Sequence, residues 1–129
     1  MCGIGVDAVE VDRFRAVLAR RPALPERVFT AAELERARRR LDPVPTLAAR
    51  FAAKEAVMKA LGVGIGAVGW HDIEVRSSAS GAPVLHLSGR AAARAEAAGA
   101  AAWHLSLTHT SVTAVASVLA ERAARGPVR

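Results

Sequence analysis

The segment Arg50–Gly62, RFAAKEAVMKALG, lies in the best-defined helix that the sequence predicts. Thr46 is the expected N-cap, and Gly62 is the glycine expected just after the last helical turn. The segment holds both lysines of the chain, Lys54 and Lys59, whereas the other 16 of the 18 basic residues are arginines. Because the lysines flank a glutamate, the segment is either an ordinary amphipathic helix with a surface ion pair or one wall of a charged site.

Three elements are expected before this helix. A strand over residues 3–9 alternates apolar with small or polar residues, and a helix over residues 11–19 follows it. Residues 30–33, TAAE, match a capping box and predict a second helix, which continues to about Arg40. Residues 42–45, DPVP, form a rigid break before the next helix begins.

Hairpins and one more helix are expected after it. Residues 62–70, GVGIGAVGW, form a glycine-rich loop. The other expected elements are strands over 72–76 and 83–87, a helix over 89–98, and strands over 103–108 and 113–119. Since hairpins are grouped with helices, without strict β-α-β alternation, the sequence predicts an α+β fold in which an antiparallel sheet packs with helices.

The composition indicates one folded domain. Of the 129 residues 52% are hydrophobic and the mean hydropathy is +0.22, which argues against disorder. We expect a single domain over residues 1–121 and a frayed tail over residues 122–129. Aromatic residues make up only 4% of the chain and much of the apolar content is alanine, so a neighbouring subunit could complete part of the core.

Several features favour a cytoplasmic protein without a membrane partner. No apolar run approaches the roughly 18 residues that a membrane-spanning helix needs. The N-terminus carries acids early and lacks the basic region of a secretory signal. The single cysteine, Cys2, excludes an intramolecular disulfide and suits a reducing cytoplasm.

The charge of the chain allows two classes of partner. A net charge of +6 and a pI near 11.2 suit either nucleic acid or an acidic protein or polyphosphate ligand. The arginines are dispersed, apart from short runs at residues 20–21 and 38–40. The chain has no tyrosine, three phenylalanines and two tryptophans, so it lacks interleaved aromatic residues for base stacking. We therefore expect no nucleic-acid partner.

One motif in the glycine-rich loop is misleading. Residues 64–69, GIGAVG, fit the G-x-G-x-x-G fingerprint of dinucleotide-binding folds. That fingerprint requires a strand before it and a helix after it, so that the pyrophosphate meets a helix N-terminus. Here a helix precedes and a strand follows, which excludes a Rossmann site. The glycines either let the backbone approach a ligand or form a flexible connector.

Phe51, Glu55 and Lys59 recur at every fourth position and form one ridge of the helix. On a surface helix, the pair of Glu55 and Lys59 would contribute about 0.2–0.5 kcal/mol. Small residues flank the ridge: Ala52, Ala56 and Ala60. They allow another element to approach closely and bury part of the ridge, and buried charges need a reason beyond helix stability.

Two further residues extend the candidate site. Asp7, on the first expected strand, supplies a second carboxylate, although an aspartate that caps a turn would also be ordinary. Carboxylates from two elements, completed by water and phosphate oxygens, are what Mg²⁺ prefers. His109 follows an apolar strand, where it is either a strand-end residue or a functional one.

Three motifs in this order resemble those of the holo-acyl-carrier-protein synthases, which are single-domain bacterial 4′-phosphopantetheinyl transferases. The motifs are GIGVD at 3–7, LAARFAAKEA at 47–56 with KALG at 59–62, and SLTHT at 106–110. The resemblance covers nearly the whole chain. It implies the phosphopantetheinyl transferase fold and the Mg²⁺-dependent transfer of the 4′-phosphopantetheine arm of coenzyme A to a serine of an apo acyl carrier protein. The other product is adenosine 3′,5′-bisphosphate.

The resemblance also implies roles for individual residues. Asp7 and Glu55 hold Mg²⁺, and Glu55, or a water that it orients, accepts the proton of the serine. Lys59 contacts the pyrophosphate and completes the catalytic set. The coenzyme A-binding residues are Arg50, Lys59, Gly62, His109 and Thr110. The carrier-protein-binding residues are Arg13, Arg20, Arg21 and Arg27.

The resemblance implies partners as well. The acyl carrier protein, of fatty-acid or polyketide synthesis, is acidic and complements the basic chain. Members of the family are homotrimers with coenzyme A bound in clefts between subunits. The role of Lys54 stays open between a phosphate contact and solvent exposure. The competing hypothesis, a non-catalytic basic nucleic-acid-binding or scaffold module, leaves Asp7, Glu55 and Lys59 unexplained.

Overall fold

A computed structural model describes residues 2–124 of the chain. The elements in chain order are β1 (Gly3–Glu10), α1 (Val11–Arg20), α2 (Leu24–Val28), α3 (Ala31–Arg38), α4 (Val44–Leu61), the 3₁₀ turn η1 (Trp70–Asp72), β2 (Ile73–Ser77), β3 (Pro83–Leu87), α5 (Gly89–Ala97), β4 (Ala100–His109) and β5 (Thr113–Arg122). The expected tail at 122–129 begins with the last residue of β5, and residues 125–129 lie outside the described residues.

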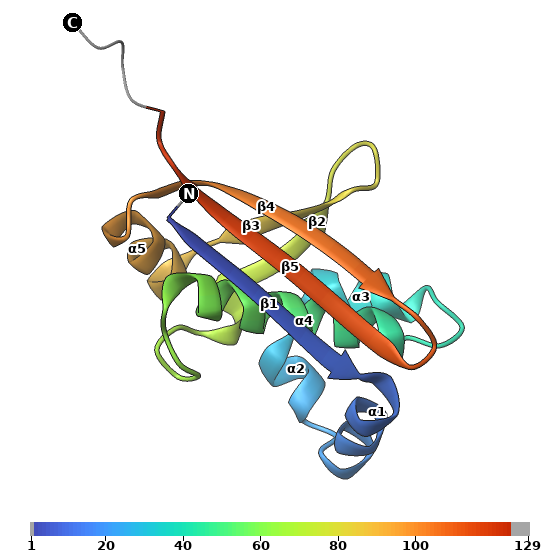
Figure 1. The fold of residues 1–129 in the computed structure, drawn as a ribbon. Coiled ribbons are helices and arrows are strands. Elements are labelled where there is room, and N and C mark those ends of the chain that lie inside the picture. Colours follow the sequence, from blue (N-terminus) through green and yellow to red (C-terminus); the bar gives the residue numbers. More distant parts are fainter. Residues whose placement is uncertain (1, 125–129) are drawn as a thin grey trace, which may run out of the picture.

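The strands form two antiparallel sheets. The order of the three-stranded sheet is β1-β5-β4, so the first and the last strand of the chain pair directly, and β2 and β3 form a separate hairpin. Figure 1 shows β1, β5 and β4 side by side with α4 behind them, α1 and α2 near one end, and α5 near the other. The predicted α+β fold is confirmed, with two sheets in place of one.

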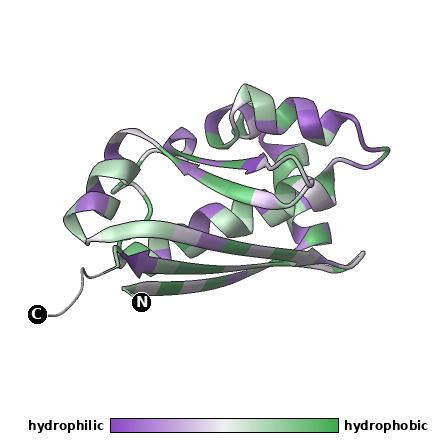
Figure 2. Cartoon of the chain, turned by 90° about the horizontal axis from the view of Figure 1, so that it is seen from above, coloured by the Kyte–Doolittle hydropathy of each residue, from purple (hydrophilic) through white to green (hydrophobic). Residues whose placement is uncertain are grey.

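Helices cover only one face of the three-stranded sheet. Figure 2 shows the sheet as an outer layer, with the helices and the β2–β3 hairpin on one side of it. Two clusters of buried side chains lie on the covered side, and Val9, Trp70 and Leu107 pack against both. On the uncovered side Ile4 is 58% exposed and Val6 52% exposed. The sheet thus has an apolar outer face that nothing in residues 2–124 covers.

Two glycines allow β1 to lie directly on α4. A Cβ atom added at Gly5 would lie 1.8 Å from the carbonyl oxygen of Ala56, and one added at Gly3 would lie 2.2 Å from that of Ala60. Any side chain at these positions would therefore push strand and helix apart. The contact confirms that the small flanks of the α4 ridge let another element approach, and it places Asp7, two residues beyond Gly5, beside the ridge.

The helix ends agree with the sequence in part. Thr30 and Glu33 form the predicted capping box, because Thr30 Oγ1 accepts the Glu33 N–H and Glu33 Oε1 accepts the Thr30 N–H. The prediction that Thr46 caps α4 is wrong: Pro43 is the N-cap, and the carboxylate of Asp42 accepts the N–H of Val44. Proline suits the first turn of a helix, because its missing N–H has no intrahelical partner there.

Other boundaries shift for similar local reasons. The short helix α2 was not expected; it begins just before Pro25, which again occupies a first helical turn. The helix after the capping box ends at Arg38 and not Arg40, and β4 begins at Ala100, three residues before the predicted start. No helix within residues 2–124 combines the length and the apolar character that crossing a membrane would require.

Candidate active site

Asp7 and Lys59 meet where β1 crosses α4. Lys59 Nζ lies 2.9 Å from Asp7 Oδ1 and donates a second hydrogen bond, also 2.9 Å long, to the carbonyl oxygen of Val6. The side chain of Asp7 is only 12% exposed, whereas that of Lys59 is 55% exposed. The ion-pair partner of Lys59 is thus a carboxylate on another element, not the preceding Glu55. The structure therefore does not show Glu55 and Lys59 as a simple helix-stabilising ion pair.

Glu55 completes this cluster. Its carboxyl group is half-buried, and burial is the main cause that raises its pKa. The negative charge of Asp7 raises the pKa further, while the Lys59 ammonium opposes the shift. Asp7 and Glu55 are therefore close enough to repel each other. Such a pair favours a bound cation, which would offset the repulsion.

The carboxylate pair alone does not form a complete metal cage. Among the described residues, no three His, Cys, Asp or Glu side chains gather as a set that could hold a metal ion. Magnesium is commonly held by one or two carboxylates, with waters and substrate phosphates as its other ligands. Asp7 and Glu55 fit that pattern better than the pattern of an all-protein site.

The glycine-rich loop borders the same cluster. Glu55 and Lys59 line a hollow of about 180 Å³ together with Met58, Val63 and residues 64–65 at the start of the loop. Gly62 ends α4 with φ of 70°, a left-handed conformation that favours glycine and turns the chain toward this hollow. The start of the loop therefore borders the candidate site.

A second hollow is strongly basic. It measures about 180 Å³ and is lined by Arg50 and His109, by two arginines that the sequence analysis did not single out, Arg36 and Arg40, and by residues of the β2–β3 hairpin. Arg36 lies on α3, whereas Arg40 lies just beyond the end of that helix at Arg38. The predicted helix through Arg40 would place the two arginines four positions apart on one side, and this was the signal available in the sequence.

Arg50 is the buried member of this basic hollow. It is only 7% exposed, and its Nε atom has no hydrogen-bond partner within residues 2–124. Burial is the main cause that lowers the pKa of Arg50, and the charges of Arg36 and Arg40 lower it further. A buried donor without a partner beside two more cations is suited to bind an anion.

The two hollows lie on different sides of the chain. Arg50 and Lys59 are nine residues apart on α4, or about two and a half turns, so their side chains leave the helix in opposite directions. Asp7 is on β1 and His109 at the end of β4, and these strands form opposite edges of the sheet. The predicted site residues therefore fall into two groups that one chain does not bring together.

Thr110 is used within its own turn. Its Oγ1 accepts hydrogen bonds from the N–H groups of Val112 and Thr113, at 3.1 and 3.0 Å, and closes the turn between β4 and β5. It does not line the basic hollow, although the preceding residue, His109, does. Thr110 thus positions the end of β4.

The predicted carrier-binding arginines surround α1 and α2. Arg20 and Arg21 are exposed at the end of α1, and Arg27 is exposed in α2. Arg13 lines a mainly apolar hollow of about 340 Å³, between the end of β1, α1 and the ring of Phe51. Arg13 and Glu10 are the charged residues that line this hollow, and its Phe51 lies one helical turn before Glu55 on α4.

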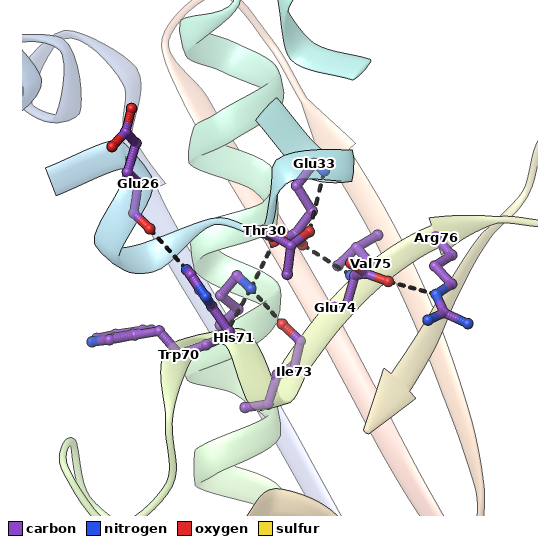
Figure 3. Close-up of polar contacts among 10 residues, drawn as sticks. Glu26, Thr30, Glu33, Trp70, His71, Ile73, Glu74, Val75 and Arg76 are labelled. Carbon is purple, nitrogen blue, oxygen red and sulfur yellow. Dashed lines mark hydrogen bonds and ion pairs between the residues drawn. The ribbon is translucent and has the colours of Figure 1, made fainter. Parts of the chain in front are cut away.

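Lys54 is neither solvated nor placed to meet a phosphate. Its side chain is fully buried, and Nζ lies 2.8 Å from Glu33 Oε1. Nζ also donates hydrogen bonds to the carbonyl oxygens of Trp70 and Ile73. Both interpretations left open by the sequence are wrong, because α3 and β2 close over this side of α4. Figure 3 shows Glu33, Thr30, Ile73 and Val75 converging in this region.

The chain is similar to proteins of one family. A model of the family described as "4'-phosphopantetheinyl transferase superfamily" matches residues 3–116. The chain is 53% identical over 119 residues to the holo-[acyl-carrier-protein] synthase of Frankia casuarinae, a match that covers 92% of this chain and 96% of that protein.

Solved structures agree in fold. The holo-[acyl-carrier-protein] synthase of Neisseria meningitidis has a TM-score of 0.86 and 35% sequence identity, and the match covers 95% of this chain and 99% of that one. A holo-(acyl-carrier-protein) synthase from Bacillus anthracis, solved in complex with CoA (3',5'-ADP), has a TM-score of 0.78 and 36% identity, covering 95% and 97% of the two chains.

Proposed function

The chain belongs to the 4′-phosphopantetheinyl transferase superfamily, and from this membership we propose that it is a holo-[acyl-carrier-protein] synthase. It transfers the 4′-phosphopantetheine arm of coenzyme A to a serine of an apo acyl carrier protein and releases adenosine 3′,5′-bisphosphate. The observation that carries the proposal is the convergence of Asp7 with Glu55 and Lys59, because it brings a second carboxylate to the two charged residues that line one hollow.

Asp7 and Glu55 are suited to hold Mg²⁺ against the pyrophosphate of coenzyme A. The fit rests on their mutual repulsion, their origin on two elements and their oxygen donors. When bound, Mg²⁺ would neutralise phosphate charge and polarise the phosphorus under attack. Lys59 is mostly exposed on the hollow side, so it can exchange its contact with Asp7 for one with the pyrophosphate.

Glu55 is the proposed general base. The serine Oγ forms a bond to the phosphorus that carries pantetheine, and the bond from that phosphorus to the bridging oxygen breaks. The proton of the serine passes to the Glu55 carboxylate, and the electron pair of the broken bond leaves with adenosine 3′,5′-bisphosphate. Burial raises the pKa of Glu55 and so makes it a stronger proton acceptor than an exposed glutamate.

The nucleotide half of coenzyme A is proposed to occupy the basic hollow. Arg50 offers a buried guanidinium whose Nε has no partner among the described residues, and His109 lines the same hollow. Since Arg50 and Lys59 point to opposite sides of one chain, a single coenzyme A would be held by Lys59 of one subunit and by Arg50 of another. This arrangement is the proposed reason for a site between subunits.

A homotrimer is part of the same proposal. The outer face of the three-stranded sheet carries apolar side chains in register, since Ile4 lies opposite Leu119 and Ala8 opposite Val115. Exposed apolar surface of this kind favours association. Packing these faces around a three-fold axis would cover them, and it would complete the small, alanine-rich core.

The carrier protein is proposed to bind at α1 and α2. An acidic carrier would meet Arg13, Arg20, Arg21 and Arg27, and an apolar side chain of the carrier would enter the hollow lined by Arg13 and Phe51. The free cysteine, Cys2, is compatible with a reducing cytoplasm, where we place the enzyme. We also propose that residues 1–121 act as one domain.

Transfer can be tested by mass spectrometry. The chain is incubated with an apo acyl carrier protein, coenzyme A and Mg²⁺, and the carrier should gain the mass of one phosphopantetheine arm. Omitting Mg²⁺ in the presence of a chelator should stop the gain, and a carrier whose acceptor serine is replaced by alanine should not react. Absence of transfer to a panel of fatty-acid and polyketide carriers would contradict the proposal.

A further inference from the structure

The fully buried pair of Lys54 and Glu33 lies near the arginine proposed to bind coenzyme A. Lys54 follows Arg50 by one helical turn on α4, so the two cations are neighbours on that helix. Glu33 belongs to α3, which also carries Arg36, a residue that lines the hollow. The pair therefore lies one helical turn from Arg50 on α4 and on the same helix as Arg36, and both arginines line the hollow.

The contacts of this pair are complete. The Lys54 ammonium uses its three donors on Glu33 Oε1, the Trp70 carbonyl and the Ile73 carbonyl. Glu33 Oε1 also accepts the N–H of Thr30, and Oε2 accepts the N–H of Val75 at 2.9 Å. Figure 3 shows how these groups from α3, η1 and β2 converge. Lys54 thus supplies the positive charge that the buried Glu33 requires.

Arg50 is in the opposite situation. Its Nε has no partner in residues 2–124, and its guanidinium borders a hollow where Arg36 and Arg40 add only positive charge. Glu33 is the acid whose charge opposes the lowering of the Arg50 pKa by burial. If Lys54 were neutral, Glu33 would be a buried carboxylate without a counterion, and Arg50 is the neighbouring cation that could replace it.

Within the proposed function, we infer that Lys54 is a positioning residue that keeps Arg50 available to the anionic part of coenzyme A by occupying Glu33. The Lys54 ammonium neutralises the Glu33 carboxylate, so the Arg50 guanidinium stays directed at the hollow. Without Lys54, Arg50 turns inward to Glu33, and the hollow loses its buried donor. The role of Lys54 is electrostatic and acts on the nucleotide half only.

Two single variants break the same ion pair but leave opposite charges. Lys54→Met leaves Glu33 to attract Arg50, so the Kd for adenosine 3′,5′-bisphosphate, measured by calorimetry, should rise about tenfold or more, as for loss of a charged hydrogen bond. Glu33→Gln removes the competing carboxylate, so the Kd should stay within about threefold of wild type, although thermal stability falls. The double variant Glu33→Gln/Lys54→Met should recover most of the affinity that Lys54→Met loses.

Steady-state kinetics provides a second readout. In Lys54→Met the KM for coenzyme A should rise, while kcat and the KM for the carrier at saturating coenzyme A remain close to wild type. A purely structural role predicts that all variants weaken binding in proportion to their loss of thermal stability. That outcome, or a tenfold weakening in Glu33→Gln, would overturn the inference even if Lys54→Met fails to fold.

The same measurements separate this inference from the proposed function. A wild-type chain that binds neither coenzyme A nor adenosine 3′,5′-bisphosphate contradicts the function itself. If the wild-type chain binds both ligands and Lys54→Met and Glu33→Gln lose affinity equally, only the role of Lys54 is contradicted. Adenosine without phosphates is the ligand control, because its affinity should not respond to the charge of Arg50.

Discussion

Glu55 is distinguished from the exposed glutamates by its surroundings. It is half-buried on α4 beside a second carboxylate, and burial followed by the charge of Asp7 raises its pKa. By contrast, Glu96 on α5 is exposed to solvent. Burial and a neighbouring charge thus raise the proton affinity of Glu55, and this is why Glu55 is the glutamate proposed to act as the base.

We expect Glu55→Gln to lower kcat by at least about a hundredfold, the usual contribution of a general base. The amide keeps the size of the side chain but cannot accept the proton, so the circular dichroism spectrum and the melting temperature should stay close to wild type. The matched control is Glu96→Gln, which should transfer the arm at the wild-type rate. A Glu55→Gln variant with near-normal kcat would remove Glu55 from its proposed role.

Glu74 on β2 makes folding stability depend on acid pH. Hydrogen bonds from the Thr30 hydroxyl and from Arg76 lower the pKa of Glu74 below its ordinary value of 4.5. The unfolded chain, in which these contacts are lost, therefore binds a proton more readily than the folded chain. The stabilisation is complete above about pH 4.5 and is lost as the pH falls through the lower pKa of the folded state.

Glu74→Gln should flatten this dependence. Urea unfolding followed between pH 3 and pH 6 should show that the variant is less stable than wild type at pH 6 and that the difference shrinks toward pH 3 (pH values to about half a unit). Glu35→Gln, at an exposed position of α3, is the comparison variant. Its free energy of unfolding should change with pH in the same way as that of wild type. A constant difference across the range would show that the charge of Glu74 is not the cause.

At the scale of elements, the contact between β1 and α4 brings together the proposed catalytic cluster. Gly3 and Gly5 let the strand touch the helix backbone at Ala60 and Ala56, and this contact determines how near Asp7 comes to Lys59. The cluster therefore depends on the absence of two side chains as much as on the charged groups. The alanines of α4 and the glycines of β1 are both small, and this lets the two elements make this close contact.

Gly5→Ala should accordingly damage both stability and activity. The new Cβ would lie 1.8 Å from the Ala56 carbonyl oxygen, so strand and helix must separate. We expect a loss of about 1–3 kcal/mol in the free energy of unfolding, the usual cost of overpacking, and a lower kcat because Asp7 moves away from Lys59. Urea unfolding measures the first effect and steady-state kinetics the second.

The stability control is Gly64→Ala in the glycine-rich loop. Apart from Gly64 itself and its two chain neighbours, no heavy atom of residues 2–124 lies within 4 Å of a Cβ added at Gly64. This change should leave the free energy of unfolding within about 0.5 kcal/mol of wild type. Equal stabilities of Gly5→Ala and wild type would show that β1 and α4 can separate without cost, which contradicts the close contact.

Prediction from sequence succeeded for elements with strong local signals. The capping box of Thr30 and Glu33 and the helix that ends at Gly62 were recognised, because each signal lies within a few consecutive residues. The N-terminus of α4 was misplaced, since two residue types that favour a helix start compete there, and the Asp42 carboxylate and Pro43 decided the outcome. α2 was missed because five residues carry little periodicity.

At the scale of the whole molecule, the proposal of a site shared between subunits makes activity depend on association. Glu55 lines one hollow, and Arg50 lines the other on the opposite side of the chain. If coenzyme A bridges two subunits, a defect in one wall can be complemented by an intact wall from a neighbour. Complementation therefore tests the shared site directly.

Glu55→Gln and Arg50→Met should each be nearly inactive alone. After the two variants are unfolded together and refolded as a mixture, about a quarter of the sites should combine two intact walls, if subunits assort at random. The expected result is a transfer rate near that fraction of wild type, with a trimer mass by light scattering. A mixture as inactive as its components, at the trimer mass, would indicate that each site lies within one chain.

The sequence by itself determined most of the local elements, the family and the candidate set Asp7, Glu55, Lys59, Arg50 and His109, since these depend on residue type and on spacing along the chain. Tertiary structure alone decided which of them meet. Lys54 and Lys59 are five residues apart, yet one is buried against Glu33 and the other pairs with Asp7. Burial and charge pairing arise from segments distant in sequence, so a helix that has two lysines cannot assign their roles until α3, β1 and β2 pack around it.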